Sequence, residues 1–348
     1  MQRLAGWVWS SRSLGARLTR LTLLPAACAF RCASALRVYA HARRWLPSAI
    51  PSVPTVAVGN LTVGGSGKTP IASWIAAYYA STGIRPAVVL RGYGGDEGDV
   101  HRQRVPQAIV VENPDRVAGA EAAVAQGAQV VVLDDAYQRL DIGRDLNIAV
   151  MSAESSRAVR WPLPAGPWRE PLAALARADL VIVTRKRAPP EAAAALVQEV
   201  RRMAPGMRTA AARLGVSGFR GLHSGVRISP EELDGARLVA GAGIADPRAF
   251  AYQCEELGAH VRLVPFPDHH AYTDRDLRRL LHAARAVDYV VITQKDAVKL
   301  RHAWPRSAPE PLVALLDVRW EMGESVVRTA LDAAAAELTG FFAPDVNP

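Results

Sequence analysis

A glycine-rich loop in the first part of the chain carries the residue types that bind a nucleoside triphosphate. In such a loop the glycines let backbone N–H groups converge on phosphate oxygens, and the helix that follows adds its partial positive charge. Lys68 would reach the β- and γ-phosphates, and the Thr69 hydroxyl would complete the shell of a magnesium ion. The alternative is a glycine turn without a ligand. The loop residues are Thr62, Val63, Gly64, Gly65, Ser66, Gly67, Lys68 and Thr69, with Thr62 at the first glycine position of the usual G-x-x-x-x-G-K-[ST] pattern.

Two consecutive acids, Asp134 and Asp135, end an apolar run that begins at Val130. A carboxylate at the carboxyl end of a strand beside a glycine loop can hold magnesium directly or through water. Paired acids at a strand end also occur as a helix cap or a solvated turn. Because Lys68 and Thr69 lie upstream, we favour the metal interpretation, and the sequence leaves open which acid binds the metal.

Two further stretches contain groups that can transfer a proton. Asp96 follows the glycine-rich run 91–95, which comes directly after a strand-like segment, so we expect it on the same rim as the nucleotide. A flexible turn is the alternative. His269 and His270 are adjacent, and neighbouring side chains diverge, so a metal site made from this pair alone is not expected. One of them is either a catalytic histidine or an ordinary histidine of a surface loop.

The pattern of apolar residues around these stretches predicts an α/β fold. Runs of Val, Ile and Leu occur at 55–59, 87–90, 108–111, 130–133, 147–151 and 180–184, and helix-like segments such as 71–81 and 117–126 lie between several of them. Strands that read as continuous apolar runs are buried on both faces, which predicts a mostly parallel sheet with helices on each side. The glycine loop after the first strand makes this a doubly wound, P-loop NTPase-like domain.

The second half of the chain repeats the alternation on a smaller scale. A helix at 189–203 is followed by a less regular stretch at 206–225, where the chain is expected to cross into a second domain. Strands at 261–264, 289–293 and 312–318 then alternate with helices at 246–258, 273–286 and 326–338. We predict an arm at 1–50, a P-loop domain at 51–215 and a smaller α/β domain at 216–348, with a ligand cleft between the two domains.

The first fifty residues form a basic arm without a single acid. The chain has a net charge of +9, and its first acidic residue is Asp96. Eight arginines of the arm are interleaved with tryptophan, leucine and phenylalanine, and the longest uncharged run there is the ten residues 21–30. That run is shorter than the roughly 20 residues that cross a bilayer. The pattern favours a basic amphipathic, membrane-associating arm that lies on an anionic membrane surface.

Two other interpretations of the arm are a secretory signal peptide and a nucleic-acid-binding segment. A secretory signal peptide would use residues 21–30 as its apolar core, but a nucleotide site belongs on the side of the membrane that holds ATP. Nucleic-acid binding would suit the charge, but the sequence contains no recognisable nucleic-acid module. The three cysteines, Cys28, Cys32 and Cys254, are too few for a disulfide framework, and we expect them to be buried in a reducing compartment.

Six stretches, taken in order, resemble the tetraacyldisaccharide 4′-kinases, the lipid A 4′-kinases of Gram-negative bacteria. The resemblance runs from the basic arm to about Trp320, nearly the whole chain. The glycine loop with its trailing Pro70, the Asp-Asp-x-x-Gln run and the Asp-His-His run give it its specificity. The stretches are residues 59–70, 91–94, 134–138, 164–171, 266–270 and 295–300.

The resemblance implies an ATP-dependent kinase that phosphorylates the 4′-hydroxyl of a tetraacyldisaccharide 1-phosphate to give lipid IVA. It implies ATP and Mg²⁺ as cofactors and a peripheral place at the cytoplasmic face of the inner membrane, with no nucleic acid and no obligate protein partner. The smaller domain would close over the P-loop kinase domain. By the resemblance, phosphates and metal are held by Ser66, Lys68 and Thr69, the acidic metal-side cluster is Asp134, Asp135 and Glu170, further site residues are Arg116 and Gln138, and the base is Asp96, paired with His269.

Departures from the family pattern keep two alternatives open. The segment that usually precedes the Gly-Asp-Glu run is absent, and Gly98, Arg139 and Gln294 replace a usual Pro, His and Glu. A P-loop nucleotide switch of the GTPase or metallochaperone type would require an Asn-Lys-x-Asp run, and residues 293–296 have the wrong order for one. A catalytically inactive homologue that still binds nucleotide and membrane is supported only by the changes around Asp96.

Overall fold

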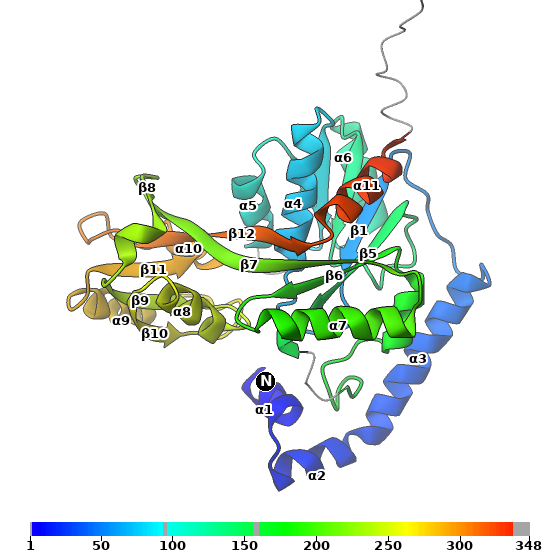
Figure 1. The fold of residues 1–348 in the computed structure, drawn as a ribbon, viewed down its shortest axis with the longest axis horizontal. Helices are drawn as coiled ribbons and strands as arrows, with labels where there is room; N and C mark the ends of the chain where they lie inside the picture. Colours follow the sequence, from blue (N-terminus) through cyan, green and yellow to red (C-terminus); the bar gives the residue numbers. More distant parts are fainter. Residues whose placement is uncertain (1, 93–95, 156–159, 337–348) are drawn as a thin grey trace, which may run out of the picture.

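The computed structural model describes residues 2–92, 96–155 and 160–336, and their strands join one twelve-stranded sheet (Figure 1). The strands are β1 (Thr55–Gly59), β2 (Pro86–Leu90), β3 (Ile109–Glu112), β4 (Val130–Asp134), β5 (Leu146–Ser152), β6 (Leu180–Arg185), β7 (Arg208–Gly221), β8 (Arg227–Ile228), β9 (Arg237–Ala242), β10 (His260–Pro265), β11 (Tyr289–Thr293) and β12 (Leu312–Met322). Their order along the sheet is β10-β9-β11-β12-β7-β6-β5-β1-β4-β2-β3, and β8 pairs with β7.

The helices of the described residues are α1 (Gln2–Ser10), α2 (Leu14–Thr22), α3 (Leu24–Ala42), α4 (Lys68–Ser81), α5 (Glu97–Arg104), α6 (Arg116–Ala125), α7 (Pro190–Met203), α8 (Pro247–Glu255), α9 (Asp274–Ala284), α10 (Gln294–Leu300) and α11 (Glu324–Ala334). Those from α4 onward cover the two faces of the sheet.

Strands β1 to β6 form the parallel part of the sheet that the apolar runs predict. Val56 and Val58 of β1 pack under α4 and α11 on one face, while Ala57 faces α6 on the other. Apart from β3 at the edge of the sheet, which is only partly buried, these strands are buried on both faces because they are apolar at successive positions. In this order β1 has β4 on one side and β5 on the other, and ligands of open α/β sheets bind at such a switch point.

Two long strands carry the sheet from the first half of the chain into the second. The prediction of a less regular stretch at 206–225 was wrong, because Arg208–Gly221 form β7. This strand pairs in parallel with β6 through its first half and antiparallel with β12 along most of its length. Arg213, Arg220 and several glycines interrupt its small and β-branched residues, so a search for continuous apolar runs does not detect this strand. The predicted domain boundary between 215 and 216 therefore falls inside a continuous strand.

The second half has its own core and returns a helix to the first. Helix α8 packs on one face of β9, β11 and β12, and α9 and α10 pack on the other. Helix α11 crosses back, so that Val327 and Leu331 join the core under α4 and the Tyr79 hydroxyl donates to the Leu331 carbonyl at 2.9 Å. Helix α11 therefore follows the second half in the sequence but packs with the first half in space.

The basic arm is three helices that stand away from the sheet (Figure 1). Helix α3 leads outward, α2 lies across its far end, and α1 returns to the body, where the Trp9 indole donates to the Pro164 carbonyl at 3.0 Å. Cys28 and Cys32 on α3 are exposed, which corrects their predicted burial, whereas Cys254 is buried as predicted. Among the described residues, only α2 and α3 taken together, with a 51° bend between them, have the length and apolar character for a bilayer crossing, and no helix has them alone.

Candidate active site

The glycine loop connects β1 to α4 and is held from several sides. Gly67 has a left-handed φ of 88° and precedes Lys68, the first residue of the helix. A side chain at Gly67 would collide with Leu214 of β7, so the loop can sit this close to the sheet only with glycine there. The Ser66 hydroxyl accepts a hydrogen bond from Asn60 at 2.8 Å, and the Ser66 carbonyl accepts one from Thr184 at 2.7 Å.

The first residues of the loop are held by backbone contacts to the segment 167–168. Thr62 forms an isolated bridge with Trp168, and the Val63 N–H donates to the Pro167 carbonyl at 2.7 Å. These backbone contacts fix where the loop leaves β1. The part from Gly64 onward, with Lys68 and Thr69, faces the cavity described below.

Asp135 holds Lys68 at the mouth of the loop. The Lys68 ammonium lies 3.6 Å from one Asp135 carboxylate oxygen, and Arg169 donates to the same oxygen at 2.9 Å. Asp135 has a φ of 53°, a left-handed conformation that is uncommon outside glycine and that turns its side chain toward these cations. Two cations on one carboxylate place surplus positive charge beside the phosphate loop.

Asp134 ends β4 and is almost completely buried. Its Oδ2 atom lies 3.1 Å from Nε2 of His101, while its Oδ1 atom has no partner with good hydrogen-bond geometry among the described residues. Burial alone would raise the pKa of Asp134, but the hydrogen bond from His101, the charge of Lys68 and a contact with the Thr69 hydroxyl lower it. The carboxylate is therefore ionised, with one oxygen left for a further partner.

Glu170 and Gln138 form a separate buried group. Glu170 is paired with Arg177, whose guanidinium lies 2.7 Å from its carboxylate. The Gln138 side chain donates to Glu170 at 3.1 Å and to the Asn60 carbonyl at 2.8 Å. In residues 2–92, 96–155 and 160–336, no three acids, histidines or cysteines have the arrangement of a metal site. Contacts through Arg169 and Gln138 connect Asp135 to Glu170. Asp134 and Asp135 line the cavity described below, whereas Glu170 is not among its lining residues.

Arg116 is the first residue of α6 and lies beside the end of β4. Its guanidinium donates to the carbonyls of Asn113 at 2.7 Å and Asp134 at 3.3 Å, and it lines the cavity. Burial and the neighbouring Arg139 lower the pKa of Arg116, which the charge of Asp134 opposes. The arginine therefore supports the end of β4 and adds positive charge beside the loop.

His269 lies opposite the loop and meets Asp96. Its Nδ1 atom is 3.3 Å from Oδ1 of Asp96, and the other Asp96 oxygen is 3.0 Å from the Lys299 ammonium. Asp96 is 1% exposed, whereas 28% of the His269 side chain is exposed and faces the cavity. His269 has a φ of 56°, so a non-glycine residue is held in a left-handed conformation at the place where the two halves meet.

The charges of this group are strongly shifted by their neighbours. Burial alone would raise the pKa of Asp96, but His269, Lys295 and Lys299 lower it to about 2. The hydrogen bond to Asp96 raises the pKa of His269, and burial opposes this change. A carboxylate with so low a pKa is a weak proton acceptor by itself, whereas the imidazole is a stronger one because of it.

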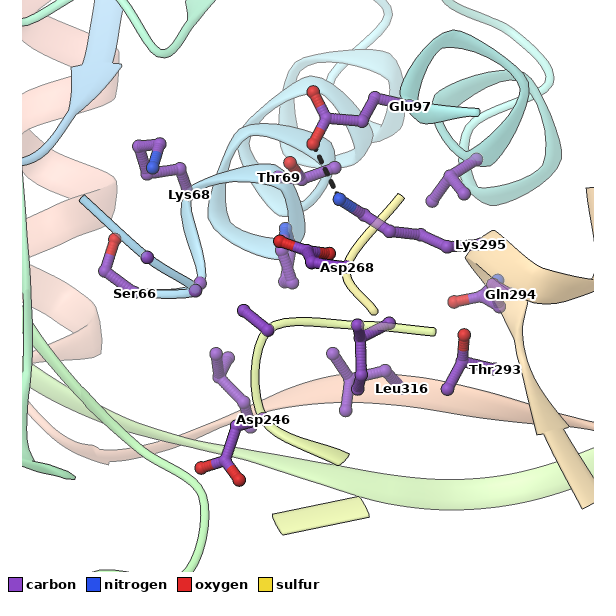
Figure 2. A pocket seen from close by; sticks show the side chains of 18 of the residues that line it. Ser66, Lys68, Thr69, Glu97, Asp246, Asp268, Thr293, Gln294, Lys295 and Leu316 are labelled. Atoms are coloured by element: carbon purple, nitrogen blue, oxygen red, sulfur yellow. Dashed lines mark hydrogen bonds and ion pairs between the residues drawn. The ribbon is translucent and has the colours of Figure 1, made fainter. Parts of the chain in front are cut away.

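A cavity of about 520 Å³ lies between the loop and the second half of the chain. Figure 2 shows Ser66, Lys68 and Thr69 on one side, and Lys295 reaching across to Glu97, with which it forms an ion pair of 2.6 Å. Asp246 and Leu316 close the opposite wall (Figure 2). Both halves of the chain thus contribute to one site, as the predicted cleft requires.

Several of these residues were missed by the sequence-based prediction. Lys295 and Lys299 lie four residues apart on one face of α10, where Lys295 forms an ion pair with Glu97 and Lys299 forms one with Asp96. That spacing was visible in the sequence, but a short helix after β11 was not predicted. His101 gave no signal, because a lone histidine in a polar segment has no distinctive pattern. Lys186 lines the cavity and donates to the Gly65 carbonyl at 2.9 Å, and it was missed because it is one lysine in a basic run.

Comparisons with known proteins show which family the chain resembles. The family model described as tetraacyldisaccharide-1-P 4′-kinase matches residues 19–336. Proteins named tetraacyldisaccharide 4′-kinase from Anaeromyxobacter sp. (strain K) and Pelobacter propionicus are 38% and 35% identical to this chain. The alignments cover 94% of this chain and 94% of the first relative, and 88% of this chain and 90% of the second.

The fold also has a counterpart among solved structures. LpxK from Aquifex aeolicus, solved in complex with ATP, matches with a TM-score of 0.70 over 91% of this chain and 99% of its own. It is 24% identical, and the likeness concerns the fold, a mostly parallel sheet with a P-loop. The matches to the family model and to its members extend over almost the whole chain. The chain therefore belongs to the tetraacyldisaccharide-1-phosphate 4′-kinase family.

Proposed function

We propose that this chain transfers the γ-phosphate of ATP to the 4′-hydroxyl of a tetraacyldisaccharide 1-phosphate, giving lipid IVA. Family membership supports the reaction, a phosphotransfer to an alcohol acceptor. The observation that carries its assignment to this cavity is the Asp96–His269 pair, at 3.3 Å, whose histidine lines the same cavity as Lys68 and Thr69. Phosphoryl transfer depends mainly on positioning and charge, and this site supplies both.

In this proposal the glycine loop binds the phosphates. Gly64, Gly65, Ser66 and Gly67 offer backbone groups at the start of α4, and Lys68 leaves Asp135 to reach the β- and γ-phosphates. Arg116 adds positive charge beside the loop, and Gln138 keeps the β1 exit in place through the Asn60 carbonyl. Thr62 and Val63 position the loop from its other end. The anion would thus replace the carboxylate as the partner of Lys68.

Thr69 and Asp134 fit a magnesium ion. Both line the cavity, and the buried Asp134 oxygen that has no partner with good hydrogen-bond geometry among the described residues suits a hard cation, which prefers oxygen ligands. Magnesium typically takes one or two carboxylates plus phosphate oxygens, so a cage of three acids is not required. When bound, the ion neutralises charge that develops on the phosphates. Asp135 and Glu170 would act from farther out, through Lys68, Arg169 and Gln138.

The Asp96–His269 pair would receive the proton of the sugar hydroxyl. His269 presents its exposed face to the cavity, and Asp96 fixes the ring through Nδ1 and stabilises the imidazolium that forms. This refines the expectation of Asp96 as the base, because Asp96 is buried between two cations. The pair would accept the proton as a unit, with the imidazole touching the substrate.

The arm is proposed to bring the site to its lipid substrate at the cytoplasmic face of the inner membrane. An acceptor with four acyl chains stays in the bilayer, so the cavity must lie at the interface. Helix α2 exposes Leu14, Leu18 and Leu21, which share one helix face, and basic residues of the arm would attract anionic lipid. The association would be peripheral, by burial of apolar side chains in the headgroup region.

Three parts are proposed to move with respect to one another. They are the arm, a P-loop part that runs from β1 to the start of β7 and includes α11, and a smaller part that carries α8, α9 and α10. Ion pairs such as Lys295–Glu97 span the two larger parts, and the β7–β12 ribbon joins them. Closure about this ribbon would remove water from the cavity.

The reaction is tested by incubating the full chain with ATP, Mg²⁺ and a tetraacyldisaccharide 1-phosphate in detergent micelles. Mass spectrometry should find one added phosphate on the 4′-oxygen, and Lys68→Ala should lower its rate by about 10²-fold or more because transition-state charge loses its partner. An unchanged rate in Lys68→Ala, or hydrolysis of ATP without phosphorylated lipid, would count against the proposal.

A further inference from the structure

A buried histidine joins α4, α5 and the end of β4 beside the cavity, and the roles assigned above do not use it. His101 lies on α5 and is 0% exposed. Its Nδ1 atom is 2.9 Å from the Ser73 hydroxyl on α4, and its Nε2 atom is 3.1 Å from Oδ2 of Asp134 at the end of β4. Ser73 and Asp134 are also buried, so this row of polar groups is shielded from bulk solvent except where Asp134 lines the cavity.

The chemistry of the three groups orders their hydrogen bonds. An ionised carboxylate only accepts, so Nε2 of His101 must carry a proton and donate it to Asp134. In the neutral imidazole Nδ1 is then an acceptor, and the Ser73 hydroxyl donates to it. The Asp134 carboxylate thus selects the tautomer of His101, and Ser73 helps to hold the orientation of the ring. The row leads in one direction, from serine through histidine to the carboxylate.

The consequence for Asp134 is that its two oxygens are no longer equivalent. Oδ2 is held by His101, and Oδ1 is buried and has no partner with good hydrogen-bond geometry among the described residues. Asp134 lines the cavity beside Lys68 and Thr69. A carboxylate fixed in this manner presents one defined oxygen to a cation, and it loses no rotational freedom when the cation binds.

The position of His101 gives the contact a second effect. Helix α5 begins directly after Asp96, so His101 belongs to the same short helix that Asp96 precedes. Lys295 and Lys299 hold the start of that helix from the other half of the chain. The His101–Asp134 contact therefore links the Asp96–His269 pair to the end of β4, where the nucleotide loop lies.

We propose that His101, oriented by Ser73, is a positioning residue that fixes the Asp134 carboxylate for a magnesium–nucleotide complex. The inference rests on the proposed function only in that Asp134 contacts the metal. Loss of a residue that orients a metal ligand typically lowers metal affinity 10- to 100-fold. The expected signature is a smaller effect of Mg²⁺ on nucleotide binding, with little change in the binding of free nucleotide.

The test measures the affinity of the full chain for a non-hydrolysable ATP analogue by calorimetry, once with Mg²⁺ and once with EDTA. The ratio of the two dissociation constants is the gain from magnesium. In His101→Leu this gain should fall about tenfold, whereas the constant in EDTA should change less than about twofold. His101→Gln, whose amide can donate in place of Nε2, should recover most of the gain.

Ser73→Ala provides a second variant that removes only one hydroxyl from α4. Its gain from magnesium should be lower than that of the wild type and higher than that of His101→Leu, because the ring keeps Nε2 but loses its orientation. A gain unchanged in both His101→Leu and Ser73→Ala overturns the inference. If His101→Leu does not fold, an unchanged gain in Ser73→Ala overturns it alone. No lipid acceptor is present, so failure of the lipid reaction would be a separate result.

Discussion

His269 Nδ1 lies 3.3 Å from Asp96 Oδ1, although the two residues come from opposite halves of the chain. Asp96 lies just before α5, the helix that follows β2, and His269 lies in the loop after β10, which lines the cavity. Lys299 of α10 holds the other Asp96 oxygen at 3.0 Å. An acid that would be a weak base alone thus becomes the partner of an imidazole that faces the nucleotide loop. This relationship joins the phosphate side and the acceptor side of the proposed site.

The proton acceptor predicts how activity depends on pH. The hydrogen bond to Asp96 raises the pKa of His269 above its ordinary value of 6.5, and the charges of Asp268 and Lys295 act in opposite directions on it. Only the neutral imidazole accepts a proton, so kcat/KM should fall as the pH decreases through this raised pKa. A pH profile of lipid phosphorylation measures the midpoint, and His269→Gln should lack this acid limb. A midpoint below 6.5 would contradict the assigned pairing.

Lys299 is predicted to stabilise the folded protein through Asp96. Lys299→Met should lower the free energy of unfolding by about 2 kcal/mol at neutral pH, because the buried carboxylate loses a charged hydrogen-bond donor. The pKa of Asp96 is about 2 in the folded protein, below its ordinary 3.8. This contribution is therefore present above about 3.8 and is lost as the pH falls toward 2. Urea titrations at decreasing pH should show the deficit shrinking.

Lys299→Arg is the matched control, since it keeps a cation beside Asp96 and should retain most of the stability. Equal stabilities of wild type and Lys299→Met at neutral pH would show that the ion pair contributes nothing to folding.

Gly67 is predicted to be required for both its conformation and its lack of a side chain. Gly67→Ala should weaken nucleotide binding at least about tenfold, because its methyl group meets Leu214 and the loop must shift. Gly206 has the same φ of 88° but open space around it, so Gly206→Ala shares only the conformational strain. That control should lose about 1 kcal/mol of stability and keep its nucleotide affinity. Calorimetric titration with an ATP analogue distinguishes the two, and equal affinities would refute the packing argument.

The leucine face of α2 is predicted to hold the protein on membranes. Changing Leu14, Leu18 and Leu21 to Gln removes three exposed apolar side chains without altering a charge. Binding to vesicles that contain anionic lipid should weaken by about 10-fold or more in a sedimentation assay, and phosphorylation of micellar lipid should fall more than nucleotide binding.

The control for this change carries the same number of substitutions elsewhere on the surface. Met203, Val226 and Met322 are exposed apolar residues outside the arm, and their replacement by Gln should leave vesicle binding unchanged. If both triple variants bind vesicles like the wild type, the arm does not act through this face.

Local patterns predicted the elements on which the nucleotide site is built. The runs at β1, β4 and β6 are apolar at successive positions, and Gly67 and Lys68 mark the start of α4, so strand, loop and helix follow from neighbouring residues. The long strand β7 was not predicted, because its pairing with β12 compensates for glycines and arginines that interrupt its pattern. Pairing across the sheet is not visible within a window of sequence.

Some contacts within the site were likewise expected, and others were not. The resemblance supplied the pair of Asp96 and His269, but nothing in the sequence placed Lys299 on the second Asp96 oxygen or His101 on Asp134. Both contacts depend on the short helices α5 and α10, which pack against each other where the two halves meet. For Glu170 the resemblance implied a place in the metal-side cluster, and the fold gives it Arg177 as a partner.

The most direct test of the account is a single-turnover measurement of lipid phosphorylation with ATP already bound, made on Asp96→Asn, His269→Gln and the double variant. The account predicts that each single change slows transfer by about 10²- to 10⁴-fold while ATP affinity is kept, and that the double variant is no slower than the slower single one, because the two residues act as one unit. Rate losses that multiply in the double variant, or transfer at the wild-type rate in His269→Gln, would contradict it.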